Sequence, residues 1–125
     1  MNEVSQQLLY QRLRNRVIDI LDLYASIDDL AKFGAFQAIN MVDDWLPIDY
    51  DRSPNVFVES ERSEIAEFFR LFEIASNSTN RDTWDVNWFK SSDEWMHLSA
   101  AAKNALLVLL ERGHFSEDKE EPSLI

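Results

Sequence analysis

Two Glu-x-x-His spacings are the strongest candidates for metal chemistry in this chain. Glu94 and His97 lie one helical turn apart, and Glu111 and His114 repeat the spacing. Carboxylate and imidazole groups so spaced hold di-iron sites in helical bundles, where the two copies lie on facing helices. Here both copies fall near one expected helix, about 25 Å apart along its axis, and Gly113 interrupts the second. We therefore expect no metal site and no bound cofactor.

A second candidate for metal binding begins like a calcium loop. Asp49 and Asp51 start a run with oxygen-bearing side chains at alternate positions, as an EF-hand loop requires. The sixth position is Pro54, where that loop needs glycine, and the twelfth is Ser60, where it needs a bidentate glutamate. The pattern therefore excludes an EF-hand.

The residue types needed for nucleophilic catalysis are scarce. The chain has no cysteine, two histidines and two glycines, so it contains neither a thiol nucleophile nor a glycine-rich phosphate loop. We expect no catalytic residues, and the sequence favours a binding protein over an enzyme. A carboxylate-rich or metal-dependent helical enzyme stays as an alternative, because carboxylates from distant helices can converge on one site.

Net charge is the most informative bulk property. The chain carries 12 basic and 23 acidic residues, a formal charge of −11, and residues 41–82 alone hold ten acidic and four basic side chains. A field of this sign repels nucleic acid phosphates and anionic lipid and attracts basic protein surfaces. We expect a basic protein partner, no direct nucleic acid binding and no membrane binding. Solubility alone is the other explanation of the charge.

Aromatic residues accompany this acid. Rings surrounded by carboxylates suit a basic protein partner, because the rings supply desolvated contact area and the charges orient the complex. The predicted partner-binding residues are Asp43, Asp44, Asp49, Tyr50, Asp51, Glu59, Glu61, Trp84 and Trp88. The alternative for the two tryptophans is that they close the core beneath the C-terminal helix. Burial of these rings separates the two interpretations.

Helical periodicity predicts the elements that position these residues. Apolar residues recur at three- and four-residue spacing in each expected helix. The pattern predicts an all-α fold, a single-domain bundle of four main helices around a central C-terminal helix at about 93–112. The other three cover about 3–25, 26–46 and 61–76, with a short helical turn near Trp84. Serines 26, 60 and 91 are the expected caps.

The central helix carries the most apolar sequence. Its inward face is formed by Trp95, Leu98, Ala102, Leu106, Leu109 and Leu110, with Ala101, Ala105, Leu107 and Val108 on the flanks. Only a narrow polar wedge is left, so we expect neighbours to enclose this helix on most sides. In contrast, the arginines at 12, 14 and 16 of the first helix are expected on a solvated face, paired with nearby aspartates.

Phe33, Phe36 and Ile39 point away from the apolar stripe of the second helix. Either this helix is covered on two sides, which we favour, or an apolar patch is left open. A homodimeric structural or interaction module is a further alternative function, and it would use these three residues as its interface. Oligomeric state separates that alternative from the others.

The expected organisation is one helical domain at 1–115 followed by an acidic flexible tail at 116–125. We expect a cytoplasmic location, because the chain has no cysteine, no apolar run near 18 residues and no signal-peptide pattern. In size, acidity, helical content and lack of catalytic residues, the chain resembles small bacterial immunity proteins and other inhibitors of basic nucleases or toxins. The resemblance implies a partner of that kind.

Overall fold

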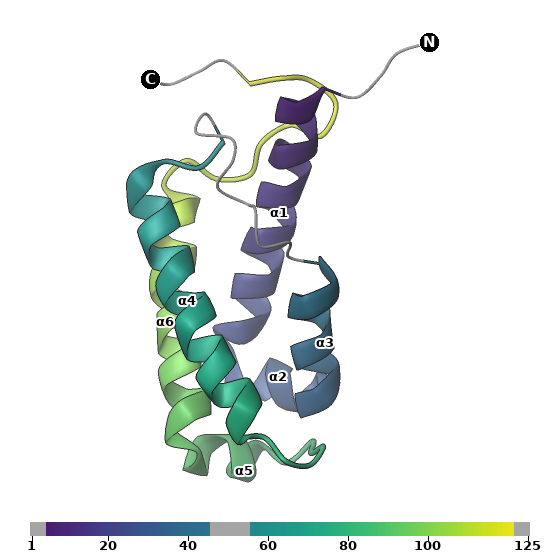
Figure 1. Cartoon of the computed structure of the whole chain (residues 1–125), viewed down its shortest axis with the longest axis vertical. Coiled ribbons are helices and arrows are strands. Elements are labelled where there is room, and N and C mark those ends of the chain that lie inside the picture. Colours follow the sequence, from purple (N-terminus) through teal and green to yellow (C-terminus); the bar gives the residue numbers. More distant parts are fainter. Residues whose placement is uncertain (1–4, 46–55, 122–125) are drawn as a thin grey trace.

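A computed structural model of the chain describes residues 5–45 and 56–121, and within these ranges it contains six helices and no strand. The helices are α1 (Gln6–Tyr24), α2 (Ile27–Phe33), α3 (Ala35–Trp45), α4 (Glu59–Ser78), α5 (Val86–Ser91) and α6 (Asp93–Leu110). In Figure 1, α1, α3, α4 and α6 run side by side, and α2 and α5 lie at the lower end of the bundle. The predicted all-α bundle is confirmed.

One hydrophobic core lies between the helices. At its centre the Tyr24 ring meets the Phe68 ring edge-on at 5.3 Å and stacks with Trp95 at 6.1 Å, while Phe89 meets Trp95 at 5.0 Å. The polar tips of the two larger rings are satisfied, as buried polar groups require. The Tyr24 hydroxyl donates to the Ala38 carbonyl at 2.7 Å, and the Trp95 indole donates to Thr79 Oγ1 at 2.9 Å.

Serine side chains mark three of the helix starts. Ser5, Ser26 and Ser92 cap α1, α2 and α6, each accepting a hydrogen bond from the backbone N–H three residues further on. The prediction for position 26 is confirmed. The predicted cap at Ser91 is wrong by one residue, and the predicted cap at Ser60 is wrong because α4 already begins at Glu59.

The second predicted helix is divided in two. Gly34 separates α2 from α3 with a backbone φ of 89° and ψ of 151°, a conformation that is costly for any residue with a Cβ. The periodicity of apolar residues runs through this break, so the sequence pattern predicted one continuous helix there. Counted as two halves of that helix, α2 and α3 leave four main helices in the bundle.

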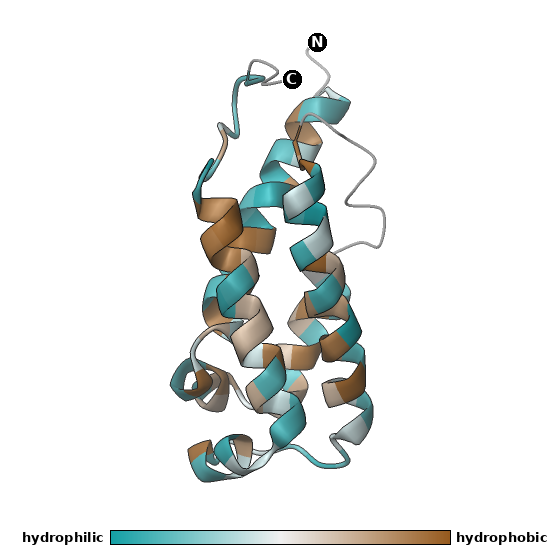
Figure 2. Cartoon of the chain, turned by 90° about the vertical axis from the view of Figure 1, so that its left-hand side faces the viewer, coloured by the Kyte–Doolittle hydropathy of each residue, from teal (hydrophilic) through white to brown (hydrophobic). Residues whose placement is uncertain are grey.

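α6 packs against α4, α1 and α5. Trp95, Leu98 and Leu109 are fully buried, but Leu107 is 66% exposed and Leu110 is 46% exposed. The expectation that neighbours enclose α6 on most sides is therefore wrong. Figure 2 shows an apolar stretch at the C-terminal end of this helix, where the chain leaves the bundle core.

The chain after α6 returns along α1 (Figure 1). Gln11 donates from its amide nitrogen to the carbonyls of Ser116 and Lys119 and accepts from the Glu121 N–H at 2.8 Å. Asn15 accepts from the Phe115 N–H at 3.0 Å. The flexible tail predicted at 116–125 stays a prediction; in the structure, residues of 116–121 are hydrogen-bonded to α1.

Candidate functional site

The loop at 79–85 docks on the junction between α2 and α3. The Ala35 N–H donates to the Thr83 carbonyl at 3.0 Å, and the Phe36 N–H donates to Asp82 Oδ1 at 3.0 Å. A carboxylate at this position also interacts favourably with the positive end of the α3 dipole. Two segments almost fifty residues apart in sequence are thereby joined.

Further hydrogen bonds hold the loop in one conformation. Thr83 Oγ1 accepts from the Asp85 N–H at 3.1 Å, and Asp85 Oδ1 accepts from the Asn87 N–H at 2.9 Å, which caps α5. At its other end, Thr79 is bonded to the buried Trp95 indole. The loop is therefore anchored on both sides of Trp84.

Trp84 lies directly over Gly34. A Cβ atom at Gly34 would be 2.6 Å from Trp84 Nε1 and 2.8 Å from Cε2, so only glycine allows the indole to approach this closely. The opposite side of the ring faces solvent, and the residue is 62% exposed. An exposed indole is therefore held against a backbone surface that a side chain would block.

Two further rings flank the glycine in sequence. Phe33 is 39% exposed and Phe36 is 42% exposed. Of the two alternatives for these residues, the structure has the open apolar patch, and the favoured two-sided covering is wrong for both phenylalanines. We call Phe33, Phe36 and Trp84 the aromatic surface.

The predicted partner-binding residues differ in their exposure. Trp84 is exposed, whereas Trp88 is half-buried and meets Trp95 edge-on at 6.5 Å. The exposed acids of the predicted set are Asp43, Asp44 and Glu59. Asp49, Tyr50 and Asp51 lie outside the described residues.

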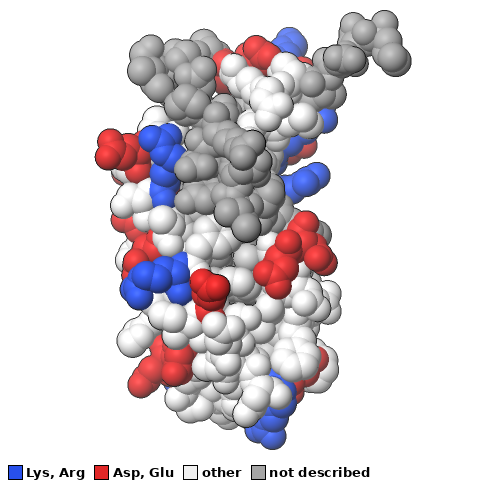
Figure 3. Space-filling view, in the orientation of Figure 1, with Lys and Arg blue, Asp and Glu red and all other residues white. Residues whose placement is uncertain are grey.

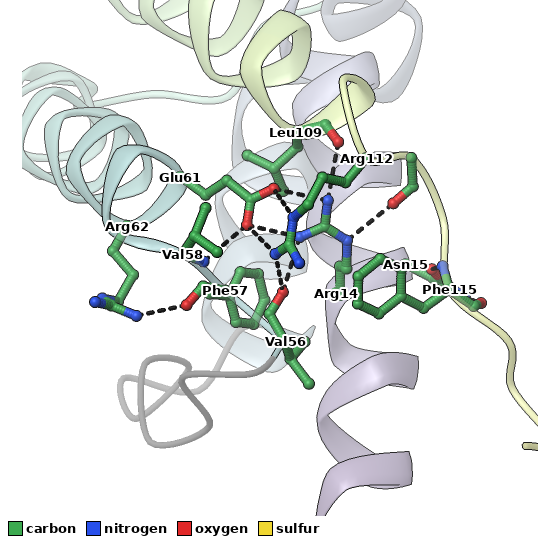
Figure 4. A network of polar contacts seen from close by, with 11 residues as sticks. Arg14, Asn15, Val56, Phe57, Val58, Glu61, Arg62, Leu109, Arg112 and Phe115 are labelled. Atoms are coloured by element: carbon green, nitrogen blue, oxygen red, sulfur yellow. Dashed lines mark hydrogen bonds and ion pairs between the residues drawn. The ribbon is translucent and has the colours of Figure 1, made fainter. Parts of the chain in front are cut away.

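Glu61 is a correction, because its side chain is buried and cannot face a partner. It forms bidentate hydrogen bonds with Arg14 at 3.0 and 2.9 Å, and Arg112 binds the same carboxylate. Figure 4 shows the three side chains converging from α4, α1 and the end of α6. We call Arg14, Glu61 and Arg112 the buried ion cluster. Arg14, expected on a solvated face, is fully buried.

Every N–H of the Arg14 guanidinium is used. Besides Glu61, it donates to the carbonyls of Val56 at 3.0 Å, Leu109 at 2.9 Å and Gly113 at 2.9 Å. Five donors therefore meet five acceptors, which is the full capacity of this group. The Phe115 ring lies 4.5 Å from the Arg14 guanidinium carbon, so a cation–π contact covers the charge.

The buried ion cluster changes the electrostatics of its carboxylate. Burial by itself would raise the pKa of Glu61, but hydrogen bonds from Arg112, Arg14 and the Val58 N–H outweigh it and lower the pKa below 4.5. Burial lowers the pKa of Arg14 from its ordinary value, while the bond to Glu61 opposes this. The carboxylate of Glu61 is therefore ionised at neutral pH, and the formal charges of one glutamate and two arginines sum to +1.

The described residues contain no group of three or more His, Cys, Asp or Glu side chains that could hold a metal ion. His97 lines a shallow groove between α4 and α6 together with Glu67, whose carboxylate is bound by Arg70 at 3.0 Å. His114 lies 3.5 Å from Asp19. The histidines of the two Glu-x-x-His spacings therefore lie in different parts of the structure, each beside a different carboxylate.

Sequence reasoning missed both the buried ion cluster and the docking of Trp84 on Gly34. A signal for the first was present, since Arg14 lies four residues after Tyr10 and three before Val17, both in the core. No comparable local signal predicts that Trp84 contacts Gly34. The sequence of the loop at 79–85 does not specify the α2–α3 junction as its partner, and the reverse is also true.

The fold places this chain in the class of single-domain, all-α proteins, and no described helix has the length and apolar character needed to cross a membrane. No protein-family model, no curated protein and no solved structure matches the chain.

Proposed function

We propose that this chain is an acidic protein-binding domain that holds a basic protein, as an immunity or inhibitor protein does with a toxin or nuclease. The observation that carries the proposal is the preorganised, exposed indole of Trp84. The part of this indole that faces water adds nothing to the stability of a monomer, whereas exposed aromatic anchors dominate the binding energy of protein interfaces.

Charge supports the choice of a basic partner. The chain has a formal charge of −11, and because the buried ion cluster contains two cations and one anion, the remaining side chains carry −12. In Figure 3, both acidic and basic side chains border a largely uncharged area in the lower half of the molecule. Dispersed charge of this kind steers a partner over long range, and short-range contacts must then select it.

The aromatic surface can supply that selection. Arginine and lysine side chains bind the face of an indole through cation–π contacts. Asp43 and Asp44 lie at the far end of α3 from Gly34, about 13 Å along the helix axis at 1.5 Å per residue. Ring and carboxylates can therefore engage one interface of ordinary size.

In an inhibitor, the carboxylates would lie where the partner normally holds substrate phosphates, or beside that place. The indole would then bury apolar area next to them and slow dissociation. We place this function in the cytoplasm and propose no direct contact with nucleic acid or membrane. These proposals rest on the charge and on the aromatic surface together.

Affinity capture from the source cell with matched variants tests the proposal. The wild type is expected to retain a basic protein that rising salt releases, and Trp84→Ala is expected to lose it. Leu9→Ser, which removes an exposed apolar side chain from α1, is the control and should still bind. Recovery of an acidic partner, or binding that is indifferent to salt and to Trp84, contradicts the proposal.

Two glycine variants separate the position of the indole from its presence. Gly34→Ala should displace Trp84 and weaken binding, whereas Gly113→Ala introduces a Cβ that meets no atom within 4 Å. Both glycines have positive φ, so both variants carry backbone strain of about 1–3 kcal/mol. Equal binding by the two variants would show that the indole need not rest on the glycine.

Steering is tested through association rates once the partner is in hand. Reversing Asp43 and Asp44 to lysine should slow association and flatten its dependence on salt, while dissociation changes less.

Elemental analysis of protein purified without chelator tests the alternative function, a metal-dependent enzyme. Stoichiometric iron, manganese or zinc would favour that alternative over the binding protein.

A further inference from the structure

A second exposed surface lies on α6, away from the aromatic surface. Lys103, Leu107 and Leu110 of α6 and its C-cap residue Glu111, whose backbone is still helical, are exposed. Their spacing of four, three and one residues puts them on one side of the helix. The Leu107 side chain is 66% exposed, although it lies only two residues from the fully buried Leu109. We call these four residues the α6 seam.

The charges of the α6 seam have no counterpart within the described part of the chain. Neither Lys103 nor Glu111 belongs to any of the ion pairs found there. They lie four residues before and four residues after Leu107. A cation, an apolar centre and an anion therefore follow one another at one-turn intervals.

We propose that the α6 seam binds the α6 seam of a second copy of this chain, in an antiparallel pair with a two-fold axis at Leu107. The axis places Leu107 against its own equivalent. It also places Lys103 opposite Glu111 of the second copy, and Glu111 opposite Lys103 of that copy, so the dimer contains two such pairs and each charge has one partner. A two-fold interface requires self-complementarity of this kind.

Other occupants fit the seam less well. A parallel pair would bring the two lysines together, and like charges at a helix interface are destabilising. A basic partner would meet Lys103 with its own positive charge. The seam and the aromatic surface therefore serve different partners on different elements.

The expected dimer is weak. The contact spans about two helical turns on each copy, which places it among interfaces below about 1,200 Å² of total buried surface. Each copy also carries a charge of −11, so long-range repulsion opposes association. The dimer should accordingly dissociate on dilution.

Sedimentation equilibrium over a range of protein concentrations tests the proposal. Wild type should show a reversible monomer–dimer equilibrium, and Leu107→Glu should raise the dissociation constant by tenfold or more. Leu9→Glu, an exposed apolar position on α1, is the matched control and should dimerise like wild type. A wild type that stays monomeric, or a Leu107→Glu variant that still dimerises, overturns the proposal.

Charge reversal tests the antiparallel register. Lys103→Glu and Glu111→Lys should each weaken the dimer on the order of tenfold, and the double variant should regain most of the wild-type affinity. Circular dichroism checks that each variant keeps its helix content. Failure of the double variant to recover, or loss of the dimer in Phe36→Ser instead, would assign the interface elsewhere.

Discussion

α1 and α6 differ in how fully they are buried, and the order is opposite to what their apolar content predicts. α1 contains Gln11, Arg14 and Asn15, and all three are buried. α6 is the most apolar stretch of the chain, yet Leu107 and Leu110 face solvent. The helix with the polar residues is the more enclosed of the two, because α6, α2, α3 and the chain after α6 all lie against it.

The reason is that enclosure depends on satisfied hydrogen bonds as much as on apolar content. Each donor of Arg14 has an acceptor, and Gln11 is bonded at both its nitrogen and its oxygen. Burying such groups costs little once they are paired, whereas burying them unpaired costs several kcal/mol. On α6 the described chain leaves 66% of Leu107 exposed, so most of its apolar area stays available for another molecule.

The largest effect is expected when this pairing is broken. Arg14→Ala should lower the free energy of unfolding by about 3–5 kcal/mol, because Glu61 loses one of its cations and three buried carbonyls lose a donor. Urea denaturation measures the change. Arg16→Ala, an exposed arginine on the same helix, should change stability by less than about 0.5 kcal/mol. Equal effects would remove the contrast between the helices.

The next effect is a dependence on acid. The folded pKa of Glu61 is lowered below 4.5, so its contribution to stability is complete above about pH 4.5 and is lost as pH falls through the folded pKa. Glu61→Gln should therefore flatten the acid limb of a stability–pH profile. Glu67→Gln should alter it little, although Arg70 lowers the pKa of Glu67 as well, because that pair is solvent-exposed.

At alkaline pH, the ionisation of Tyr24 in α1 is expected to govern how stability depends on pH. Burial, with a smaller contribution from Asp43, raises the pKa of Tyr24 above its ordinary value of 10.0. Its contribution to stability is complete below pH 10 and is lost as pH rises, since the unfolded chain then ionises first. Tyr24→Phe should remove this alkaline loss in the same profile and cost about 1 kcal/mol at neutral pH for the hydrogen bond to Ala38.

A smaller effect is expected from releasing the chain end. Gln11→Ala should cost about 1 kcal/mol by removing the side-chain partner of partly buried backbone groups, and it should speed hydrogen exchange of the Glu121 amide. Gln37→Ala, an exposed glutamine on α3, serves as the control. Exchange at 116–121 that is already as fast in wild type as in the variant would support a free tail.

The smallest effect completes the contrast. Leu107→Ser should change the stability of dilute monomer by less than about 0.5 kcal/mol, because the residue is largely exposed. Leu109→Ala, two residues along the same helix and fully buried, should cost about 2–5 kcal/mol. A large loss from Leu107→Ser would place that side chain in the core.

Some local features of this fold could be predicted from the sequence, although two of the three predicted caps and the break at Gly34 were not. The helix predicted at about 93–112 is observed at Asp93–Leu110, and Ser26 caps α2 as expected. Of the residues predicted to bind a partner, Trp84, Asp43, Asp44 and Glu59 are exposed, and their role stays a prediction; the sequence did not separate the exposed Trp84 from the half-buried Trp88. Periodicity and capping depend on residues three or four positions apart, which is why they can be recognised in one stretch of chain.

Only the tertiary structure decided which side chains are available. The burial of Glu61 depends on Arg14, 47 residues earlier, and on Arg112, 51 residues later. Gly34 breaks its helix where Trp84 docks, and Leu107 is left exposed because the other helices pack on the opposite side of α6. Each of these outcomes is set by contacts between distant segments. A local hydrophobic pattern does not specify which distant segment packs against it.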